Sequence, residues 1–353
     1  LCEFSRYPSC PSLRPNICSN LYIIELACRH YRNCNEPKAF ASKMNKKTKY
    51  SAAGEVGDVR VRRTRWGRIK ITLSKAPISA WFGMFVVACY AFVAIFAPLL
   101  APFGEAEIFA KADLPWAWHD GNAKHFFGTD QIGRDTLSRL IYGARNTIGI
   151  ALVTTCLSFL IGGSLGLIAA INRSWLDQFL SRGIDVLMSI PSLIFALMLL
   201  SIFGSSIPSL IMIIAVLDST RVYRLTRSVA INVAIMDYVE AATLRGEGLG
   251  WIMRREILPN IMTPLVAEFG LRFSFVLLTI AALSFLGLGI QAPTTDWGSM
   301  VRDGSRFIQF VAFDWTLALP SLLPAGAVAL LTVAVNFVVG WFLHMTSGLR
   351  DEI

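Results

Sequence analysis

Charge is scarce in this sequence of 353 residues, because only 16% of its side chains are Asp, Glu, Lys or Arg. An ordinary soluble domain has about 25%. Hydrophobic residues make up 54% of the chain, and its mean hydropathy is +0.53. A water-soluble fold has nowhere to bury so much apolar surface. The composition therefore excludes a set of soluble domains and predicts an all-α membrane protein.

The sequence also lacks the patterns of common catalytic and metal sites. No GxxxxGK[ST] phosphate loop occurs, so we expect the chain not to hold ATP in the usual way. Its four histidines, His30, His119, His125 and His344, have no metal-ligand spacing. No grouping of Ser, His and Asp suggests hydrolysis. We therefore expect a chain that is not an enzyme, with no catalytic residue, no cofactor and no metal of its own.

Cysteine is sparse outside the first residues. Five of the seven fall before residue 35, so that stretch is either a small disulfide-bonded module, a signal peptide or a non-native extension. Met44 followed by Asn45, Lys46 and Lys47 is typical of a natural start. We therefore expect residues 1–43 to be an extension translated from upstream sequence.

Uncharged windows supply the membrane crossings, each of which needs about 20 residues. The window 186–217 is too long for one helix, at roughly 48 Å against a hydrocarbon core of about 30 Å. The turn-forming run 204–208 divides it into a third helix ending near Phe203 and a fourth starting near Pro208. The other windows are 76–104, 146–172, 273–295 and 315–343. The sequence thus predicts six transmembrane helices.

The basic residues orient these helices. With six crossings and both termini cytoplasmic, nineteen Lys and Arg after Met44 lie inside and seven lie outside, as the positive-inside rule requires. Residues 60–75 interleave basic side chains with Trp66, which favours a helix that contacts membrane lipids. A nucleic-acid arm is the alternative, and we expect no nucleic-acid partner.

These assignments divide the chain into segments. After residues 1–43 we expect a cytoplasmic basic amphipathic segment, a first helix with a periplasmic loop, a transmembrane core and a cytoplasmic tail. Their bounds are 44–75, 76–145, 146–343 and 344–353.

Four charges fall close to or within the predicted helices. Asp218 and Arg221 are three residues apart, and Glu268 precedes Arg272 by four, which is the favoured order for an ion pair on a helix. We place them near the span ends. Structural pairing and a role in gating or in the substrate route are both open.

The loop 237–260 between the fourth and fifth predicted helices carries the main functional pattern. Tyr238 to Arg245 has good helix formers, and glycines then break the helix. A second helical run, Trp251 to Leu258, is expected to stop before Pro259. The pattern predicts a short exposed helix-turn-helix suited to docking, and an ordinary amphipathic connector is the alternative.

The spacing in this loop resembles the EAA loop of permeases in binding-protein-dependent ABC importers. Its matching residues are Glu240, Ala241, Ala242, Gly246, Ile257, Leu258 and Pro259. The resemblance implies the type I (MetI-like) permease fold and a coupling helix that sits in a cleft of an ATPase subunit. Glu240 would engage donor groups of the ATPase there, and the small residues would permit close contact.

Further stretches resemble the dipeptide, oligopeptide and nickel permeases of the DppC and OppC type. They are the run from Phe127 to Arg145, the run from Ser284 to Pro293 with Asp296-Trp297-Gly298, and Ser189-Ile190-Pro191. In the first run, charges flank two glycines and predict a tight turn at the outer membrane face. That turn either meets a periplasmic binding protein or is a self-contained clamp. Its residues are Gly128, Thr129, Asp130, Gly133, Arg134 and Asp135.

The resemblance implies a permease of the bacterial inner membrane that moves dipeptides or oligopeptides into the cytoplasm by alternating access. Its implied partners are a second permease of the DppB or OppB type, two ABC ATPases that bind ATP and Mg, and a periplasmic solute-binding protein. Nickel or another solute is the alternative substrate. A secondary transporter or channel without an ATPase is the rival class, and it predicts inverted repeats and mid-span charges.

Overall fold

A computed structural model describes residues 76–109, 125–172, 175–310 and 318–346. These residues form helices joined by loops, with one isolated β-bridge between Thr129 and Asp135. The longer helices are α4 Ile78–Ile95, α7 Thr136–Ile171, α8 Trp175–Ser189, α9 Ser192–Phe203, α10 Ile207–Ala234, α13 Leu258–Phe285 and α15 Leu319–Thr346. The shorter ones are α5 Ala97–Leu100, α11 Asp237–Leu244, α12 Leu249–Ile252 and α14 Trp297–Gly304, with a π-helix Met253–Ile257 and a 3₁₀-helix Ser305–Phe310.

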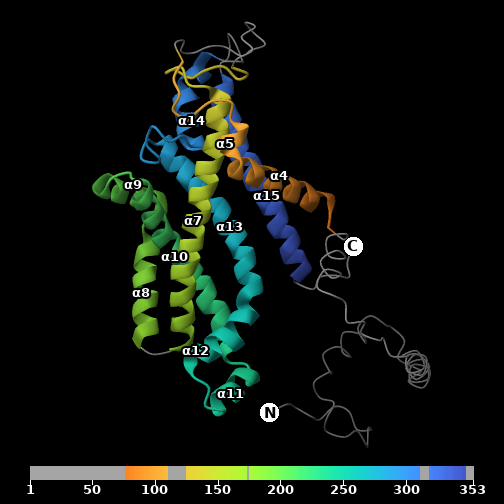
Figure 1. The fold of residues 1–353 in the computed structure, drawn as a ribbon. Coiled ribbons are helices and arrows are strands. Elements are labelled where there is room, and N and C mark those ends of the chain that lie inside the picture. The colour runs from red at the N-terminus through yellow and green to blue at the C-terminus, as the bar shows by residue number, and fades with distance from the viewer. Residues whose placement is uncertain (1–75, 110–124, 173–174, 311–317, 347–353) are drawn as a thin grey trace, which may run out of the picture. The chain divides into compact units, whose positions relative to one another are not determined.

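Helices α7 and α10 lie side by side along much of their length (Figure 1). Two glycines of α7 make this approach possible. A Cβ atom on Gly162 would clash with the Ser219 carbonyl oxygen of α10, and one on Gly166 would lie 2.9 Å from Thr226 Cβ. Small residues allow helix backbones to meet closely in membranes, where packing replaces the hydrophobic effect as the driving force.

The apolar core joins α7, α9, α10, α13 and α15. Its members include Leu200, Ile214 and Ile280, all nearly inaccessible to solvent. A second buried cluster lies where α7 and α10 end and α13 begins, and it includes Leu167, Ala230 and Ile261. α11 and α14 lie near opposite ends of α7 (Figure 1), and we name these the α11 end and the α14 end.

The predicted division of the window 186–217 is confirmed. α9 ends at Phe203 and α10 begins at Ile207, with Gly204 between them at φ +85°, a conformation that glycine adopts without steric cost. A second break falls at Pro191, as is typical of a proline in a helical run. α8 ends at Ser189 and Pro191 caps α9, so the two helices meet at a bend of 90°.

Four described helical stretches are long and apolar enough to cross a membrane: Ile78–Ile95, Thr136–Ile171, Leu249–Phe285 and Leu319–Thr346. The bent pair α8 and α9 gives a fifth if it forms one span. The six-crossing count is therefore not confirmed by length and composition. α10 falls short because Asp218, Arg221, Arg224 and Arg227 lie within it.

Three predicted boundaries were wrong. α7 begins at Thr136, so the stretch up to Arg145 is helix rather than loop. The window 273–295 overlaps only the second half of α13, which runs from Leu258 to Phe285. The run that was expected to stop before Pro259 continues into α13 through the π-helix. Pro259 has no N–H to bond to Arg255, and a wider turn at this point accommodates that loss.

Several predictions fall on residues outside the described ranges. They are the extension 1–43, the amphipathic segment 60–75 and the last residues of the tail 344–353. They stay predictions.

Candidate functional site

The α11 end is an exposed helix seated on a buried base. Glu240, Ala241 and Leu244 face outward on α11, and Leu244 is 82% exposed. Val239 and Ala242 face inward and join the second buried cluster, in which Ala242 is fully buried. Ala242 must therefore be small to pack inside its own protein. Ala241 is exposed, and its short side chain lets another surface approach α11 closely.

A glycine ends α11 in a defined way. Gly246 has φ +82°, its N–H donates to the Thr243 carbonyl at 2.9 Å, and the Glu247 N–H donates to the Ala242 carbonyl at 3.3 Å. These two bonds form a Schellman motif, which satisfies carbonyls at the helix end and favours glycine at the left-handed position. Gly246 thus sets the direction in which the chain leaves the exposed helix.

The remaining residues predicted for this loop fix α11 to the bundle. Ile257 is 1% exposed and lies in the same buried cluster as Ala242, while Leu258 packs against it and Pro259 is exposed. The Asn260 side-chain amide donates to the Tyr238 hydroxyl at 3.1 Å and so ties α13 to α11. The structure therefore brings the predicted residues into one unit, with Glu240, Ala241 and Gly246 on its surface and Ala242 and Ile257 in its base.

The α14 end has the opposite character, because the charged side chains of its motif are largely buried and paired. Asp130 accepts bonds from the Arg134 N–H and from Arg134 Nε, both at 2.8 Å, and contacts Arg139 Nη1 at 2.5 Å. Gly128 and Gly133 have φ values of +74° and +87°, so the tight turn that the sequence predicts is present. Thr129 pairs with Asp135 across the β-bridge.

Asp135 is the N-cap of α7. One carboxylate oxygen accepts bonds from the Ser138 N–H and hydroxyl at 2.7 Å, and the other lies 3.1 Å from His125 Nδ1. An aspartate at this position satisfies backbone N–H groups that the first helical turn leaves free. The turn is thus locked onto the start of α7.

Residues that the sequence reasoning missed extend this network to the segment after α13. Arg139 lies 3.3 Å from Asp303 Oδ2, and Gln131 donates to the Asp303 carbonyl. The Glu105 carboxylate accepts bonds from Thr295 N–H at 2.6 Å and from the Asn146 amide at 2.9 Å. These partners are far apart in sequence, so no local spacing could have revealed them.

The Asp296-Trp297-Gly298 stretch forms the start of α14. Asp296 caps it in a reciprocal arrangement with Ser299, and burial raises the pKa of the Asp296 carboxyl above its usual value. Trp297 is 1% exposed and donates from Nε1 to the Leu140 carbonyl at 3.1 Å. These contacts hold α14 against α7. Together with the paired charges they favour the clamp interpretation of the external motif.

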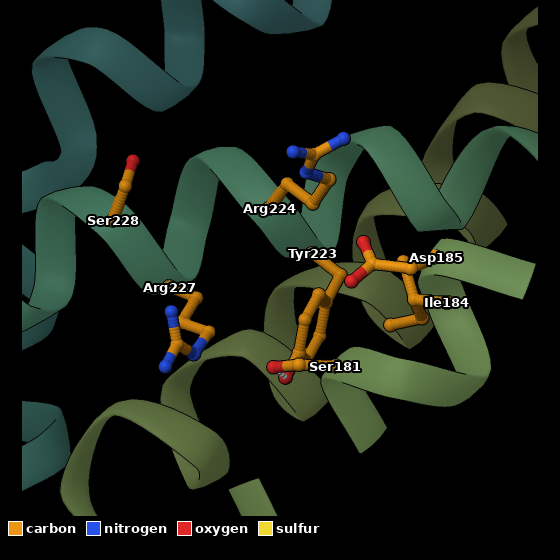
Figure 2. Close-up of a pocket in the computed structure, with 7 residues that line it drawn as sticks. All are labelled: Ser181, Ile184, Asp185, Tyr223, Arg224, Arg227 and Ser228. Atoms are coloured by element: carbon orange, nitrogen blue, oxygen red, sulfur yellow. Dashed lines mark hydrogen bonds between the residues drawn. The ribbon is translucent and has the colours of Figure 1, made fainter. Parts of the chain in front are cut away.

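A cavity of about 290 Å³ lies between α8 and α10 and is lined by polar and charged side chains. Figure 2 shows Tyr223 pointing from α10 toward α8, where its hydroxyl lies 3.0 Å from Ser181 Oγ. Arg227 forms two bonds to the Asp177 carboxylate, at 2.5 and 2.6 Å. Arg224 and Asp185 line the same cavity without an ion pair among the described residues. The charged residues on this face of α10 explain why its composition does not identify it as a membrane span.

The charge pairs predicted within helices form differently from the expectation. Arg272 contacts Glu268 at 2.7 Å, as predicted, but it also lies 3.6 Å from Asp218, whereas Arg221 makes no ion pair within the described ranges. Asp218 and Arg272 lie in the middle of α10 and α13 rather than near span ends.

Comparison with known proteins identifies the family. Residues 162–346 match the family model described as binding-protein-dependent transport system inner membrane component. The dipeptide transport system permease protein DppC of Escherichia coli K12 is 38% identical over 273 residues, which cover 77% of this chain and 87% of that protein. The di/tripeptide transport system permease protein DppC of Pseudomonas aeruginosa is 35% identical over 77% of this chain and 86% of its own length. The DppC protein of Alkalihalophilus pseudofirmus is 33% identical over 77% and 84%. The resemblance inferred from the sequence is thus confirmed, and the chain belongs to the family of permease components of binding-protein-dependent importers in the inner membrane.

Proposed function

We propose that this permease moves dipeptides or short oligopeptides into the bacterial cytoplasm by alternating access, driven by ATP that partner subunits hydrolyse. The peptide substrate follows from the names of its relatives, which transport dipeptides or di- and tripeptides. The chain makes six crossings in this proposal, with the bent pair α8–α9 as one and α10 as another. Both termini are then cytoplasmic, and the α11 end faces the cytoplasm.

The proposed partners are a second permease of the DppB or OppB type, two ABC ATPases and a periplasmic peptide-binding receptor. ATP and Mg belong to the ATPases. One exposed docking helix per chain favours a pair of permeases, because two ATPases need two docking sites.

The observation that carries the proposal is the split of α11 into an exposed face and a buried face. Leu244 is 82% exposed beside Glu240, while Val239 and Ala242 are anchored in the bundle. Further large apolar side chains of this loop are exposed, namely Met236, Tyr238 and Leu249, and a group of exposed apolar side chains is typical of a protein contact surface. Because the same helix is fixed to α7, α10 and α13 through the second cluster, a push on α11 reaches the membrane helices.

Reconstitution of the whole importer tests this proposal. The complex in proteoliposomes should accumulate a receptor-delivered dipeptide only with ATP. We expect Glu240→Arg to lower uptake by about tenfold or more while ATP hydrolysis continues, since a charge reversal at a contact surface costs on the order of 2 kcal/mol or more. The control is Glu107→Arg, which changes an exposed glutamate near the α14 end. Normal uptake by the Glu240 variant would refute the coupling role, and uptake without the ATPases would favour a secondary transporter.

A further inference from the structure

Four charged side chains lie in the middle of the helical bundle. Asp218 and Arg221 are central in α10, and Glu268 and Arg272 are central in α13. The Ser158 hydroxyl of α7 donates to the Asp218 carboxylate at 3.3 Å. Charges at this depth are costly in a membrane and mark functional sites by default.

Three of these charges form ion pairs with one another. Arg272 Nε lies 2.7 Å from Glu268, and Arg272 Nη1 lies 3.6 Å from Asp218. The Arg272 guanidinium also sits over the Phe275 ring at 4.8 Å. This group has two carboxylates and one guanidinium, so it keeps one negative charge when all three are ionised.

Arg221 is the fourth charge. It is exposed on α10 and makes no ion pair within 4.0 Å and no hydrogen bond among the described residues, but it is close enough to Asp218 for the two charges to interact. Together with Asp218 it lines a cavity of about 60 Å³. Ser192 of α9 and Thr279 of α13 line the same cavity. The cavity alone holds a few waters at most.

An exposed guanidinium at this depth is incompatible with a lipid-facing surface. A lone central arginine costs about 3 kcal/mol or more. In the six-crossing proposal α10 is a membrane span, and Arg221 is the fifteenth of its 28 residues, so its side chain lies within the span. The face of α9, α10 and α13 around Arg221 therefore meets water or protein.

We propose that this face lines the solute path and that the Arg221 guanidinium binds the carboxylate end of a passing peptide. Arg221 presents planar donors that match a carboxylate in a bidentate geometry. The negative charge of the neighbouring Asp218, Glu268 and Arg272 group offsets part of this attraction, which allows release, as conduction requires. The inference rests on the proposed function, and the second permease supplies the opposite wall.

Cysteine labelling tests whether the face is water-lined. In the complete importer, with all seven cysteines of this sequence replaced, Arg221→Cys should react with a membrane-impermeant cationic methanethiosulfonate. The matched control is Phe85→Cys, from an apolar side chain that is 69% exposed in the middle of α4, and it should stay unlabelled. An unreactive cysteine at 221 overturns the proposal, because a lipid contact or a permanent protein contact would shield it.

Uptake measurements test the carboxylate contact. Arg221→Gln should lower uptake of a free-acid dipeptide by about tenfold or more, because a charge-assisted hydrogen bond is lost, and it should lower uptake of the C-terminal amide much less. Arg221→Lys should restore only part of the uptake that Arg221→Gln loses, because Lys keeps the charge but not the bidentate geometry. Arg224→Gln, one turn away on α10 and facing the other cavity, should stay within about twofold of wild type.

The outcomes separate the two hypotheses. Equal loss for the acid and the amide, or equal loss in the Arg224 variant, overturns the role of Arg221. If the wild-type importer takes up no peptide, the proposed substrate class fails, and labelling at position 221 still decides whether the face is water-lined.

Discussion

The α14 end and the α11 end use similar residues in opposite ways. At the α14 end, Asp130, Arg134 and Arg139 are at most 12% exposed as side chains and pair with one another. At the α11 end, Glu240 and Arg245 are exposed and make no ion pair among the described residues. A charged motif therefore marks a clamp in one place and an available surface in the other, and burial distinguishes the two.

The glycines differ in the same manner. Gly298 at the α14 end is packed so tightly that a Cβ there would clash with the Ala281 carbonyl oxygen, whereas a Cβ on Gly250 or Gly246 would meet no atom within 4 Å. Close packing around Gly298 therefore fixes the α14 end, whereas the left-handed backbone conformation of Gly246 shapes the α11 end.

The largest effect should follow from breaking the buried charge network. Arg139→Met removes two charge-assisted hydrogen bonds, one to Asp130 and one to Asp303, and such bonds contribute about 1.5–3 kcal/mol each, so we expect a loss of about 3 kcal/mol or more in stability. Thermal unfolding of the detergent-solubilised protein measures it. Arg302→Met is the matched control, because Arg302 is 41% exposed and pairs only loosely with Asp303, and its cost should be below about 1 kcal/mol. Equal shifts in the two variants would contradict the clamp.

The next effect should come from overpacking. Gly298→Ala forces a methyl group toward α13 and should cost about 1–3 kcal/mol. Gly250→Ala adds the same group in open space within α12 and should be neutral or slightly stabilising. The same unfolding assay compares them, and a stable Gly298 variant would show that α14 can shift away from α13.

The smallest effect on stability should come from substituting Gly246. The informative measurement for this variant is ATP-driven uptake. Gly246→Ala places a side chain at φ +82°, which costs about 1–2 kcal/mol. The strain should redirect the end of α11 and lower ATP-driven uptake, while the unfolding temperature should fall by less than in the Gly298 variant. Gly248→Ala, at negative φ and in open space, is the control and should transport normally.

Much of this fold follows from local sequence. Uncharged windows locate α4, α7 and α15, and the run after Phe203 locates the turn before α10. Both signals, a long apolar stretch and a cluster of turn residues, are local in the sequence. The start of α8 at Trp175 was missed, since Arg182 and Asp185 hide the apolar face of α8 from a search for uncharged windows. The extension of α13 through Pro259 was missed because a proline stops most helices.

Local sequence likewise predicts only part of each site. The EAA spacing predicts α11 and its glycine, but it does not reveal that Ala242 faces inward, because that depends on Leu167 and Ile261 from other helices. The clamp motif predicts the turn at Gly128 and Gly133. It does not predict the contact from Arg139 to Asp303, since 164 residues separate the two.

One cross-linking measurement tests most directly the claim that α11 is the docking element. In the assembled importer without other cysteines, Leu244→Cys should form a photo-crosslink to an ATPase subunit through a thiol-attached benzophenone, and nucleotide should change the yield. Ile132→Cys, which is 54% exposed at the α14 end before replacement, should form none. A crosslink from position 132 to the ATPase, or none from position 244, would contradict the account.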